Sequence, residues 1–428
     1  MAKYQKCTEY KDSAIKEIGV IPKHWDISKV KFLAKYLDGQ RIPLNGTERR
    51  ERSGTVPYWG ANKIVDYVND WIFDEELVLL GEDGAPFFDT TKDVAFAING
   101  KIWPNNHVHV LRPNRLKVGI KYLTYSLNCT DYSLYISGST RDKLNQSDMD
   151  NILIRMPSLI EQTQIANFLD YETAKIDYLI EKQQQLIELL KEKRQAVISY
   201  LVNVKEGEAS IKLKYAVEIL AGYSFSSTGF KTDSNDGVAL LRGINVGVGN
   251  IKWDECVWWS KSDTEGLERY ILKKGDLVFG MDRPWISTGA RVAEIQEYDL
   301  PSYLVQRVAR VRALRGFYQP YIKLILGSKE FKSFIESDLT GVSVPHISTD
   351  QIISFPIRKL YFEQQVKQTD QAIESINKID FLIVKAESAI QLMQERRTAL
   401  ISAVVTGKID VRNWQAPTIA EADTELSA

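Results

Sequence analysis

The chain has 428 residues, of which 44% are hydrophobic and 26% are charged. This balance is typical of a folded protein of two to four domains, at about 100–200 residues per domain, and it excludes intrinsic disorder as the main state. No apolar run reaches the length of about 18 residues that a membrane span needs, and no secretory signal opens the chain. The formal net charge of −1 does not indicate a nucleic-acid binder, so any basic surface has to be local.

The three cysteines lie far apart, at Cys7, Cys129 and Cys256. This spacing argues against a disulfide framework and against a zinc ribbon, because both need cysteines in close sets. It suits the reducing cytoplasm, which is where we expect the protein to work.

Residues 1–156 are rich in predicted strands. Apolar runs occur at 77–80, 94–98 and 108–111, separated by turn signals such as Asn-Gly and Asp-Gly pairs. A helical candidate at 120–128 follows them. We expect an α+β domain that mixes strands and short helices.

A long helix is predicted from Glu161 to Val202, because this stretch contains no glycine or proline and is rich in Leu, Ile, Glu, Gln and Lys. Its apolar residues recur at steps that combine into sevens and elevens, as in a coiled-coil seam. We assign 157–206 to this first helical segment, which ends near Gly207. The predicted seam comprises Ile165, Leu169, Ile176, Ile180, Ile187, Leu190, Val197 and Leu201.

The second half of the chain repeats this plan. Residues 207–355 contain predicted strands at 238–241, 276–279 and 308–313 and a helical candidate at 320–336. A second helical segment follows at 356–410, and a C-terminal tail occupies 411–428. The second predicted seam comprises Val366, Ile373, Ile376, Ile383, Ile390, Met393, Leu400 and Val404.

The two helical segments are copies of one another. Between 175–205 and 378–408, at an offset of 203 residues, 15 of 31 positions are identical. An insertion of one residue also aligns Glu161-Gln162 with Glu363-Gln364. The globular segments match more weakly, at offsets of 183 and 200. The sequence therefore predicts a duplicated unit, in which a globular domain is followed by a long helix.

A helix of forty residues spans ~60 Å and cannot bury its stripe inside one small domain. We therefore expect two globular heads separated by two long antiparallel helices, which form a coiled-coil rod with pseudo-two-fold symmetry. The alternative is that each helix folds onto its own head. Polar residues near the seam, at Gln183, Arg194 and Arg397, either fix its register or face a further partner.

Positive charge concentrates on the globular segments. Residues 39–63 carry a net charge of +3 and residues 301–335 a net charge of +6. Phosphate contact requires such patches, although solvated charged faces are common in all classes of protein. Loops in the same domains carry residue types that read base edges, since Arg and Lys pair with guanine while Asn and Gln pair with adenine.

The candidate DNA-binding residues therefore come from these loops and basic stretches. An ordinary polar loop explains each residue equally well by itself, and the tryptophans also suit a core. In the first domain they are Arg41, Arg49, Arg50, Arg52, Tyr58, Trp59, Asn62, Lys63, Asn105, Asn106, His107, Thr140, Arg141, Lys143 and Asn145. In the second domain they are Arg242, Asn245, Arg283, Gln306, Arg307, Arg310, Arg312, Thr340, Ser343 and His346.

Several catalytic motifs are absent from the sequence. It contains no Gly-x-x-x-x-Gly-Lys-Ser/Thr, Gly-x-Gly-x-x-Gly or Gly-x-Ser-x-Gly loop, and no Asn/Asp-Pro-Pro-aromatic motif of amino-methyltransferases. His107 and His109 are spaced for one strand face, but no third metal ligand lies near them in the sequence. We interpret them as structural or DNA-facing, not metal-binding. These absences favour a binding protein over an enzyme.

Three local motifs stand out in the chain. They are the opening Tyr10-Lys11-Asp12-Ser13 with Ile18-Gly19 and Ile21-Pro22-Lys23-His24-Trp25, the segment Glu161 to Asp177 with its copy, and the ending Ala403 to Val411. These motifs resemble the specificity subunits of type I restriction–modification systems. The second helical copy lacks the Ile-Ala-x-Phe-Leu run of the first, so a partner that docks on that copy would use different contacts.

The resemblance implies that each globular segment is a target-recognition domain, which reads one half of a split sequence in double-stranded DNA. The helices would set the unread gap and dock two methyltransferase subunits, which bind S-adenosylmethionine and methylate adenine. Restriction subunits, which use ATP and Mg, would complete the complex. This chain would itself bind no cofactor and catalyse no reaction.

Two other functions remain open. The chain could be a scaffold whose heads bind protein, with the rod as a dimerisation device. It could also be a self-sufficient restriction or modification enzyme, although the required motifs are absent. Steep salt dependence and sequence preference would favour a DNA reader over the scaffold. Turnover of S-adenosylmethionine by the chain alone would favour the enzyme.

Overall fold

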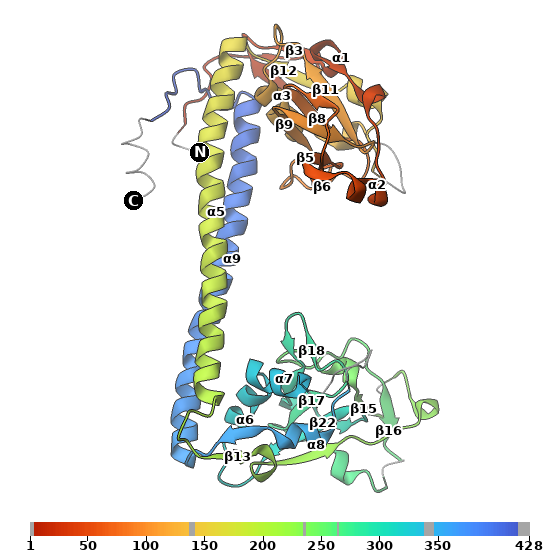
Figure 1. The fold of residues 1–428 in the computed structure, drawn as a ribbon, viewed down its shortest axis with the longest axis vertical. Helices are drawn as coiled ribbons and strands as arrows, with labels where there is room; N and C mark the ends of the chain where they lie inside the picture. The colour runs from red at the N-terminus through yellow and green to blue at the C-terminus, as the bar shows by residue number, and fades with distance from the viewer. Residues whose placement is uncertain (1–3, 137–141, 234–236, 263–264, 338–345, 418–428) are drawn as a thin grey trace. The chain divides into compact units, whose positions relative to one another are not determined.

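The computed structural model describes residues 4–136, 142–233, 237–262, 265–337 and 346–417. The chain divides into two compact units. Unit 1 comprises residues 1–184 and 387–428, and unit 2 comprises residues 185–386. Each unit contains one globular head and a part of each long helix (Figure 1).

The first head, in unit 1, is built on an antiparallel sheet with the strand order β4-β11-β8-β9. Leu77 and Leu79 of β8 belong to the apolar cluster shared with a second sheet, while Val78 and Leu80 belong to the cluster that contains α3. Because successive side chains alternate between the two faces of a strand, β8 is buried on both faces and needs a continuous apolar run. The elements are β4 (Ala34–Tyr36), β8 (Leu77–Gly81), β9 (Ala95–Ile98), β11 (Val108–Pro113) and α3 (Ile120–Asn128).

The second sheet of the first head has the order β6-β5-β10-β7, and its strands β5 and β10 run parallel. The last strand of the head, β12, pairs with β3 near its beginning and so closes the head. The sheet comprises β5 (Ser53–Trp59), β6 (Ile64–Val68), β7 (Phe73–Asp74) and β10 (Lys101–Pro104). The remaining elements are β1 (Tyr10–Asp12), β2 (Val20–Pro22), β3 (Asp26–Lys29), α1 (Val30–Leu33), α2 (Gly46–Glu51), α4 (Gln146–Asp150) and β12 (Leu153–Met156).

The second head, in unit 2, repeats this topology with the sheets β14-β22-β17-β20 and β16-β15-β21. Strands β15 and β21 run parallel, as β5 and β10 do, and β13 pairs with β23 to close the head. The strands are β13 (Ser210–Lys212), β14 (Val217–Ala221), β15 (Gly237–Leu241), β16 (Trp258–Ser260), β17 (Leu277–Gly280), β18 (Trp285–Ile286), β19 (Gly289–Ala290), β20 (Val292–Glu294), β21 (Ser302–Leu304), β22 (Val308–Ala313) and β23 (Pro356–Arg358).

Two details of the second head differ from the sequence prediction. The helical stretch predicted at 320–336 is two helices, α6 (Gln319–Leu326) and α7 (Lys329–Glu336), because the Ser328 hydroxyl accepts a hydrogen bond from the Phe331 N–H at 3.1 Å and starts a new helix. The start of the predicted second helical segment is the strand β23, and a short helix, α8 (Thr349–Ser354), precedes it.

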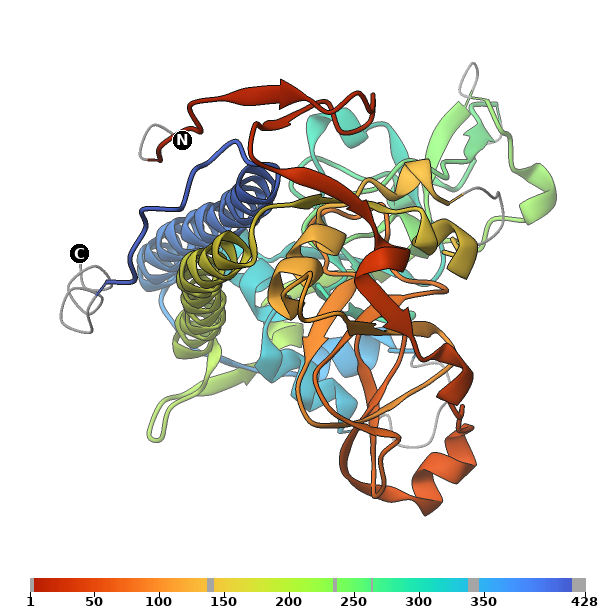
Figure 2. The same cartoon turned by 90° about the horizontal axis from the view of Figure 1, so that it is seen from above.

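The two long helices are α5 (Leu159–Val202) and α9 (Phe362–Val405), each of 44 residues. Within each unit they run side by side in opposite directions (Figures 1 and 2). Arg397 pairs with Asp177 at 3.0 Å in unit 1, and Arg194 pairs with Asp380 at 2.8 Å in unit 2. These two ion pairs are equivalent under the 203-residue offset. They give a structural role to the two seam arginines.

The apolar stripe of each helix is shared between the other helix and a head. None of the sixteen predicted seam residues is exposed. Ile165 and Leu169 join the core of the first head together with Val404, while Leu201 and Ile376 join the core of the second. The helices therefore pair, as the sequence predicts, and their ends also pack on the heads.

A buried glutamine fixes the N-terminal end of each helix to its head. The Gln162 amide accepts from the Gly119 N–H at 2.9 Å and donates to the carbonyls of Lys117 and Pro157. Gln365 makes the equivalent set of three hydrogen bonds. The alignment of Glu161-Gln162 with Glu363-Gln364 was therefore wrong by one residue, and the 203-residue offset continues without an insertion.

The two ends of the chain pack on the start of α5. Phe168 lies between the rings of Tyr4 and Trp414, at centroid distances of 5.6 Å and 5.4 Å. Gly407 has a φ of +76°, and a Cβ there would lie 2.4 Å from Pro22. The opening, helical and ending motifs therefore pack against one another within unit 1. The Ile-Ala-x-Phe-Leu run is buried within unit 1, which explains why a copy without these contacts lacks it.

Candidate nucleic-acid interface

Four segments of the first head meet where β5, β8 and β10 end. The Asn105 N–H donates to the Trp59 carbonyl at 2.9 Å, and the Glu82 N–H donates to the His107 carbonyl at 2.9 Å. The Leu144 N–H donates to the Glu82 carbonyl at 2.8 Å. These bonds join the segments 59–63, 81–84, 105–107 and 142–145, which we call the first loop cluster.

The second head joins four topologically equivalent segments by the same three hydrogen bonds. The Val305 N–H donates to Leu241 at 3.2 Å, the Met281 N–H to Arg307 at 2.9 Å, and the Ile347 N–H to Met281 at 2.9 Å. We call the segments 241–245, 280–283, 305–307 and 346–348 the second loop cluster. Most of the loop residues that the sequence analysis selected in the two domains lie in these clusters.

An aspartate lies at the centre of each cluster, just after the central strand of the main sheet. In the first cluster Asp83 lies 3.4 Å from Nδ1 of His107 and forms a β-bridge with Lys143. In the second cluster the Asp282 carboxylate accepts hydrogen bonds from Arg307 at 2.8 Å and His346 at 2.6 Å. Partial burial opposes ionisation of Asp282, but these two hydrogen bonds and charges prevail and lower its pKa.

The candidates of the first domain have different environments. Tyr58 is in the core, Arg49 pairs with Asp66, and Arg52 lies over the ring of Trp103. Trp59, Asn62, Asn105 and His107 are half-buried in the first loop cluster. The exposed candidates are Arg50, Arg52, Lys63, Asn106, Lys143 and Asn145.

The candidates of the second domain fall into two groups, which are exposed residues of the loop cluster and residues with partners inside the head. Arg283, Gln306, Arg307 and His346 are exposed and belong to the second loop cluster. Asn245 is buried and bonds to its own loop, while Arg242 is half-buried and donates to the Glu255 carbonyl. Arg310 is 4% exposed and pairs with Glu218, and Arg312 pairs with Asp276. Internal contacts suffice to explain these last four residues.

The stretch 301–335 is not the free basic patch that its net charge suggested. Five of its seven basic side chains pair with carboxylates from elsewhere in the head. The partners are Asp282 for Arg307, Glu218 for Arg310, Asp276 for Arg312, Glu294 for Lys323 and Glu336 for Lys332. Counting charge along the sequence overestimates the basic surface, because four of the five neutralising groups come from other segments of the head and Glu336 follows Lys332 in the same helix.

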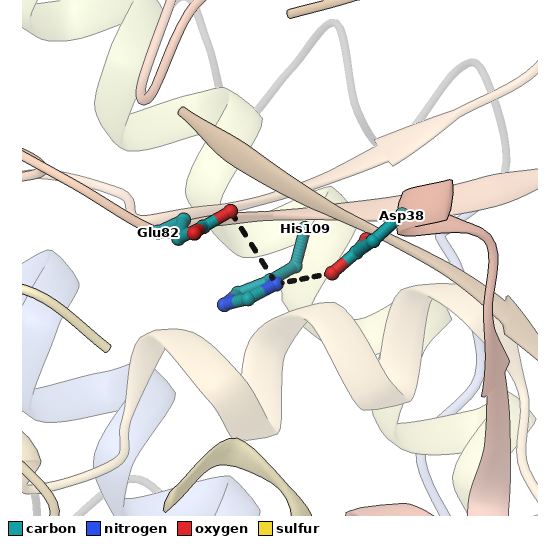
Figure 3. A group of neighbouring side chains, drawn as sticks. All are labelled: Asp38, Glu82 and His109. Carbon is teal, nitrogen blue, oxygen red and sulfur yellow. Dashed lines mark hydrogen bonds and ion pairs between the residues drawn. The ribbon is translucent and has the colours of Figure 1, made fainter. Parts of the chain in front are cut away.

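Arg41 belongs to an ion-pair network beside the first loop cluster. His109 lies with Nδ1 2.6 Å from Asp38 and 3.8 Å from Glu82 (Figure 3). Arg41 donates to Glu82 and to the Val108 carbonyl, each at 2.6 Å. Burial alone would raise the pKa of Asp38, but the hydrogen bond and charge of His109, aided by Arg41, lower it. The network holds three segments of the head together.

No third metal ligand lies near His109 along the sequence, whereas the fold brings Asp38 and Glu82 to it. The cluster nevertheless does not suit a metal ion. Nε2 of His109 lies 2.8 Å from the Leu144 carbonyl, so it carries a proton, and Nδ1 faces a carboxylate. A metal needs a ring nitrogen lone pair, and the Arg41 guanidinium already neutralises the carboxylates. Among the described residues, this is the group of His, Asp and Glu side chains that comes nearest to a metal site.

Four candidates, Thr140, Arg141, Thr340 and Ser343, lie outside the residues that the structure describes. The sequence analysis missed the central aspartates Asp83 and Asp282. A signal for both was present, since each follows a predicted strand in a turn. Residue type alone does not indicate a carboxylate as part of a DNA-binding site, because a free carboxylate repels the phosphates.

Comparisons with known proteins agree with the motifs. Residues 22–189 match the family model of the type I restriction modification DNA specificity domain. The chain is 25% identical to the MjaVIII specificity subunit of Methanocaldococcus jannaschii, over 94% of this chain and 98% of that protein. It is 31% identical to the EcoAI specificity subunit of Escherichia coli, over 42% of this chain and 31% of that protein. The resemblance to type I specificity subunits is confirmed.

Solved structures share the fold. A chain from a structural study of complex assembly and conformational transition in a type I R-M system matches with a TM-score of 0.67 at 13% identity, over 91% of this chain and 99% of that one. The HsdS subunit from Thermoanaerobacter tengcongensis matches with a TM-score of 0.53 at 14% identity, over 91% and 98%. The predicted α+β class with two long helices is confirmed. No helix in the described part of the chain is long and apolar enough to cross a membrane.

Proposed function

We propose that this chain is the DNA-specificity subunit of a type I restriction–modification complex, in which each head reads one half of a split target. One observation carries this proposal. Two loop clusters of equivalent topology expose different sets of Arg, Lys, His, Asn and Gln side chains on the same backbone hydrogen bonds. A repeated frame with varied base-reading groups is what two halves of a non-repeating target require.

The chemistry of the clusters suits double-stranded DNA. The first offers amides and amines, from Asn62, Lys63, Asn106 and Lys143. The second offers guanidinium groups and an imidazole with one amide. Amides suit adenine, whereas guanidinium and ammonium groups suit guanine and backbone phosphates. A protein-binding scaffold needs no such set, and the family match of residues 22–189 also disfavours it.

The helices would set the unread gap and dock two methyltransferase subunits. Tyr178, Leu179 and Leu392 are exposed in unit 1, and their repeat equivalents Phe381, Leu382 and Leu189 are exposed in unit 2. A lysine lies over each aromatic ring, Lys182 over Tyr178 at 5.2 Å and Lys385 over Phe381 at 5.5 Å. Large exposed apolar residues mark interaction surfaces, and a matched pair of them suits two copies of one partner.

Catalysis would lie entirely in the partners. S-adenosylmethionine would bind to the methyltransferase subunits, and ATP with Mg to the restriction subunits. This chain would hold neither cofactor nor metal and would choose where an adenine is flipped out and methylated. The cytoplasm suits this work, since all three cysteines are free thiols.

The decisive experiment maps methylated adenines in the DNA of cells that express this chain together with its methyltransferase subunit. Cells that lack this chain are the control. We expect a split motif with a fixed unread gap, present only with this chain. An assembled complex that leaves no motif would overturn the proposal and favour the scaffold.

Docking can be tested on each unit separately. The double variant Tyr178→Ala with Leu179→Ala and the double variant Phe381→Ala with Leu382→Ala should each reduce the complex from two methyltransferase subunits to one. Mass photometry of the purified complex measures this ratio. Retention of both subunits by both variants would exclude these surfaces.

A further inference from the structure

The second loop cluster contains two exposed arginines in a backbone conformation that arginine rarely adopts. Arg283 has a φ of 43° and Arg307 a φ of 66°, and both flank Asp282 in space. Ala14 is the third non-glycine residue with positive φ in the described part of the chain. Such conformations are unfavourable for a side chain with a Cβ and persist where the surrounding structure imposes them, often at binding sites.

Packing does not account for this arrangement. The side chain of Arg307 is 67% exposed and that of His346 is 54% exposed, whereas that of Asp282 is 25% exposed. An exposed ion pair contributes little to stability, because water screens it, and it does not offset the cost of the backbone conformation. The contacts therefore serve to place exposed groups, more than to stabilise the head.

The Asp282 carboxylate restrains Arg307 from one side. Its Oδ2 accepts from Nη1 of Arg307 at 2.8 Å, and its Oδ1 accepts from His346 at 2.6 Å. Arg291 supports the same turn from within the head, donating from Nη1 to the Asp282 carbonyl at 2.8 Å and from Nε to the Val246 carbonyl at 2.9 Å. No other group in the described residues accepts a hydrogen bond from the Arg307 guanidinium. Its remaining N–H donors are therefore available to a ligand.

We propose that Arg307 is a specificity-determining residue that reads a guanine in the half-site of the second head, and that Asp282 is its positioning residue. This inference rests on the proposed function. Guanine presents two acceptors, O6 and N7, in the major groove, and a guanidinium with fixed orientation matches them with two N–H donors. Restraint by a carboxylate reduces the conformational freedom that the arginine loses on binding.

The first loop cluster also has an aspartate at its centre, but different side chains surround it. His107 takes the place of Arg307, Lys143 takes that of His346, and Gly84 follows Asp83 where Arg283 follows Asp282. The first head therefore lacks a carboxylate-held arginine at this point. This contact between an arginine and a guanine should belong to one half of the target only.

The test uses the complete complex of this chain with its methyltransferase subunits and DNA in which both half-sites are randomised. Sequencing of the bound and methylated fraction gives the base preference at each position. Arg307→Ala should reduce the preference for guanine at one position of one half by about 5- to 150-fold, the range measured for a bidentate contact, and should leave the other half unchanged. Arg307→Lys should restore phosphate attraction without restoring this preference.

The variant Asp282→Asn distinguishes a positioning role of this carboxylate from a simple effect of its charge. A surface anion that only repels DNA would, when neutralised, strengthen binding to every sequence and leave the preferences intact. A positioning residue should instead lose guanine preference at the position that Arg307→Ala affects. Arg315→Ala, an exposed arginine of the same head outside the cluster, is the matched control and should leave every preference intact.

The outcomes distinguish this inference from the function on which it rests. If the parent complex prefers a split sequence and Arg307→Ala keeps every base preference of the parent, the guanine contact alone is overturned. Equal weakening on all sequences, with a salt dependence shallower by about one phosphate, would reassign Arg307 to the DNA backbone and also overturn it. Absence of any sequence preference in the parent complex would overturn the proposed function itself.

Discussion

The two heads use the same backbone frame but distribute their charged side chains differently. In the first head Asp38, Glu82, Arg41 and His109 form an ion-pair network that joins the loop cluster, through Glu82, to other segments of the fold. In the second head the strand residues Arg310 and Arg312 are neutralised by carboxylates of the same head. The ion pair of Asp282 with the exposed Arg307 lies in the loop cluster itself. A basic residue of such a head therefore has to be assigned by its partner, because its position in the sequence does not show whether it stabilises the fold or is available to a ligand.

The largest expected effect tests whether the heads are independent modules. Exchange of residues 210–358 for the second head of another specificity subunit should change one half of the methylated motif completely and leave the other half unchanged. These limits keep β13 and its partner β23 together, because a strand separated from its partner exposes unpaired backbone groups. Adenine-methylation mapping measures the result. A change in both halves would contradict the modular comparison.

The next effect concerns two equivalent arginines at the closing strands. Arg358 donates to Glu208 and to the carbonyls of Tyr200 and Leu201, whereas no carboxylate in the described residues pairs with Arg155, whose pKa burial lowers. Arg358→Met should destabilise unit 2 by about 1–3 kcal/mol, since it removes the charged hydrogen bonds of a buried guanidinium to a half-exposed carboxylate, but Arg155→Met should be neutral or stabilising in unit 1.

Amide hydrogen exchange, read separately for the two units, measures both effects. Equal losses of protection in the two variants would show that the carboxylate partner does not matter. A stable Arg358→Met variant would mean that the carbonyls find other donors.

A third difference should appear in acid. The pKa of Asp38 is lowered in the folded head, so its ionised form contributes stability above the pKa of about 3.9 that it has when unfolded. That contribution is lost as the pH falls through the lower folded pKa. Asp38→Asn should therefore weaken the first head at pH 6 and flatten its loss of stability between about pH 4 and pH 2. Tryptophan fluorescence against pH measures the transition, and an unchanged acid limb would contradict the ion-pair account.

The smallest effect is expected where the two units are most alike. The pairs Arg194–Asp380 and Arg397–Asp177 are half-exposed, so double-mutant cycles should give couplings of about 0.2–1 kcal/mol, decreasing with salt. Arg397 also lies 3.8 Å from Asp93. Arg397→Ala should therefore still reduce the free energy of unfolding when Asp177 has already been replaced by alanine. Couplings above about 2 kcal/mol in either cycle would show that these pairs are more than surface ion pairs.

The sequence was sufficient to determine the duplicated plan, the two long helices and their apolar seams. These features depend on local periodicity, which any stretch of the chain carries within itself. The same offset of 203 residues relates the two equivalent ion pairs of the helices, although the sequence alone did not identify the partners of Arg194 and Arg397. The loop positions of most candidate DNA contacts could likewise be chosen from residue type and turn signals.

Which basic groups are available to a ligand depends on contacts that form only when the chain folds. Arg307 and Arg310 lie three residues apart, yet one is exposed and the other is buried against Glu218 from β14. The pairing of His109 with Asp38, and of Asp282 with His346, joins segments that are 71 and 64 residues apart. Charges separated by that distance along the chain have no local signature, because their interaction exists only once the sheets have formed.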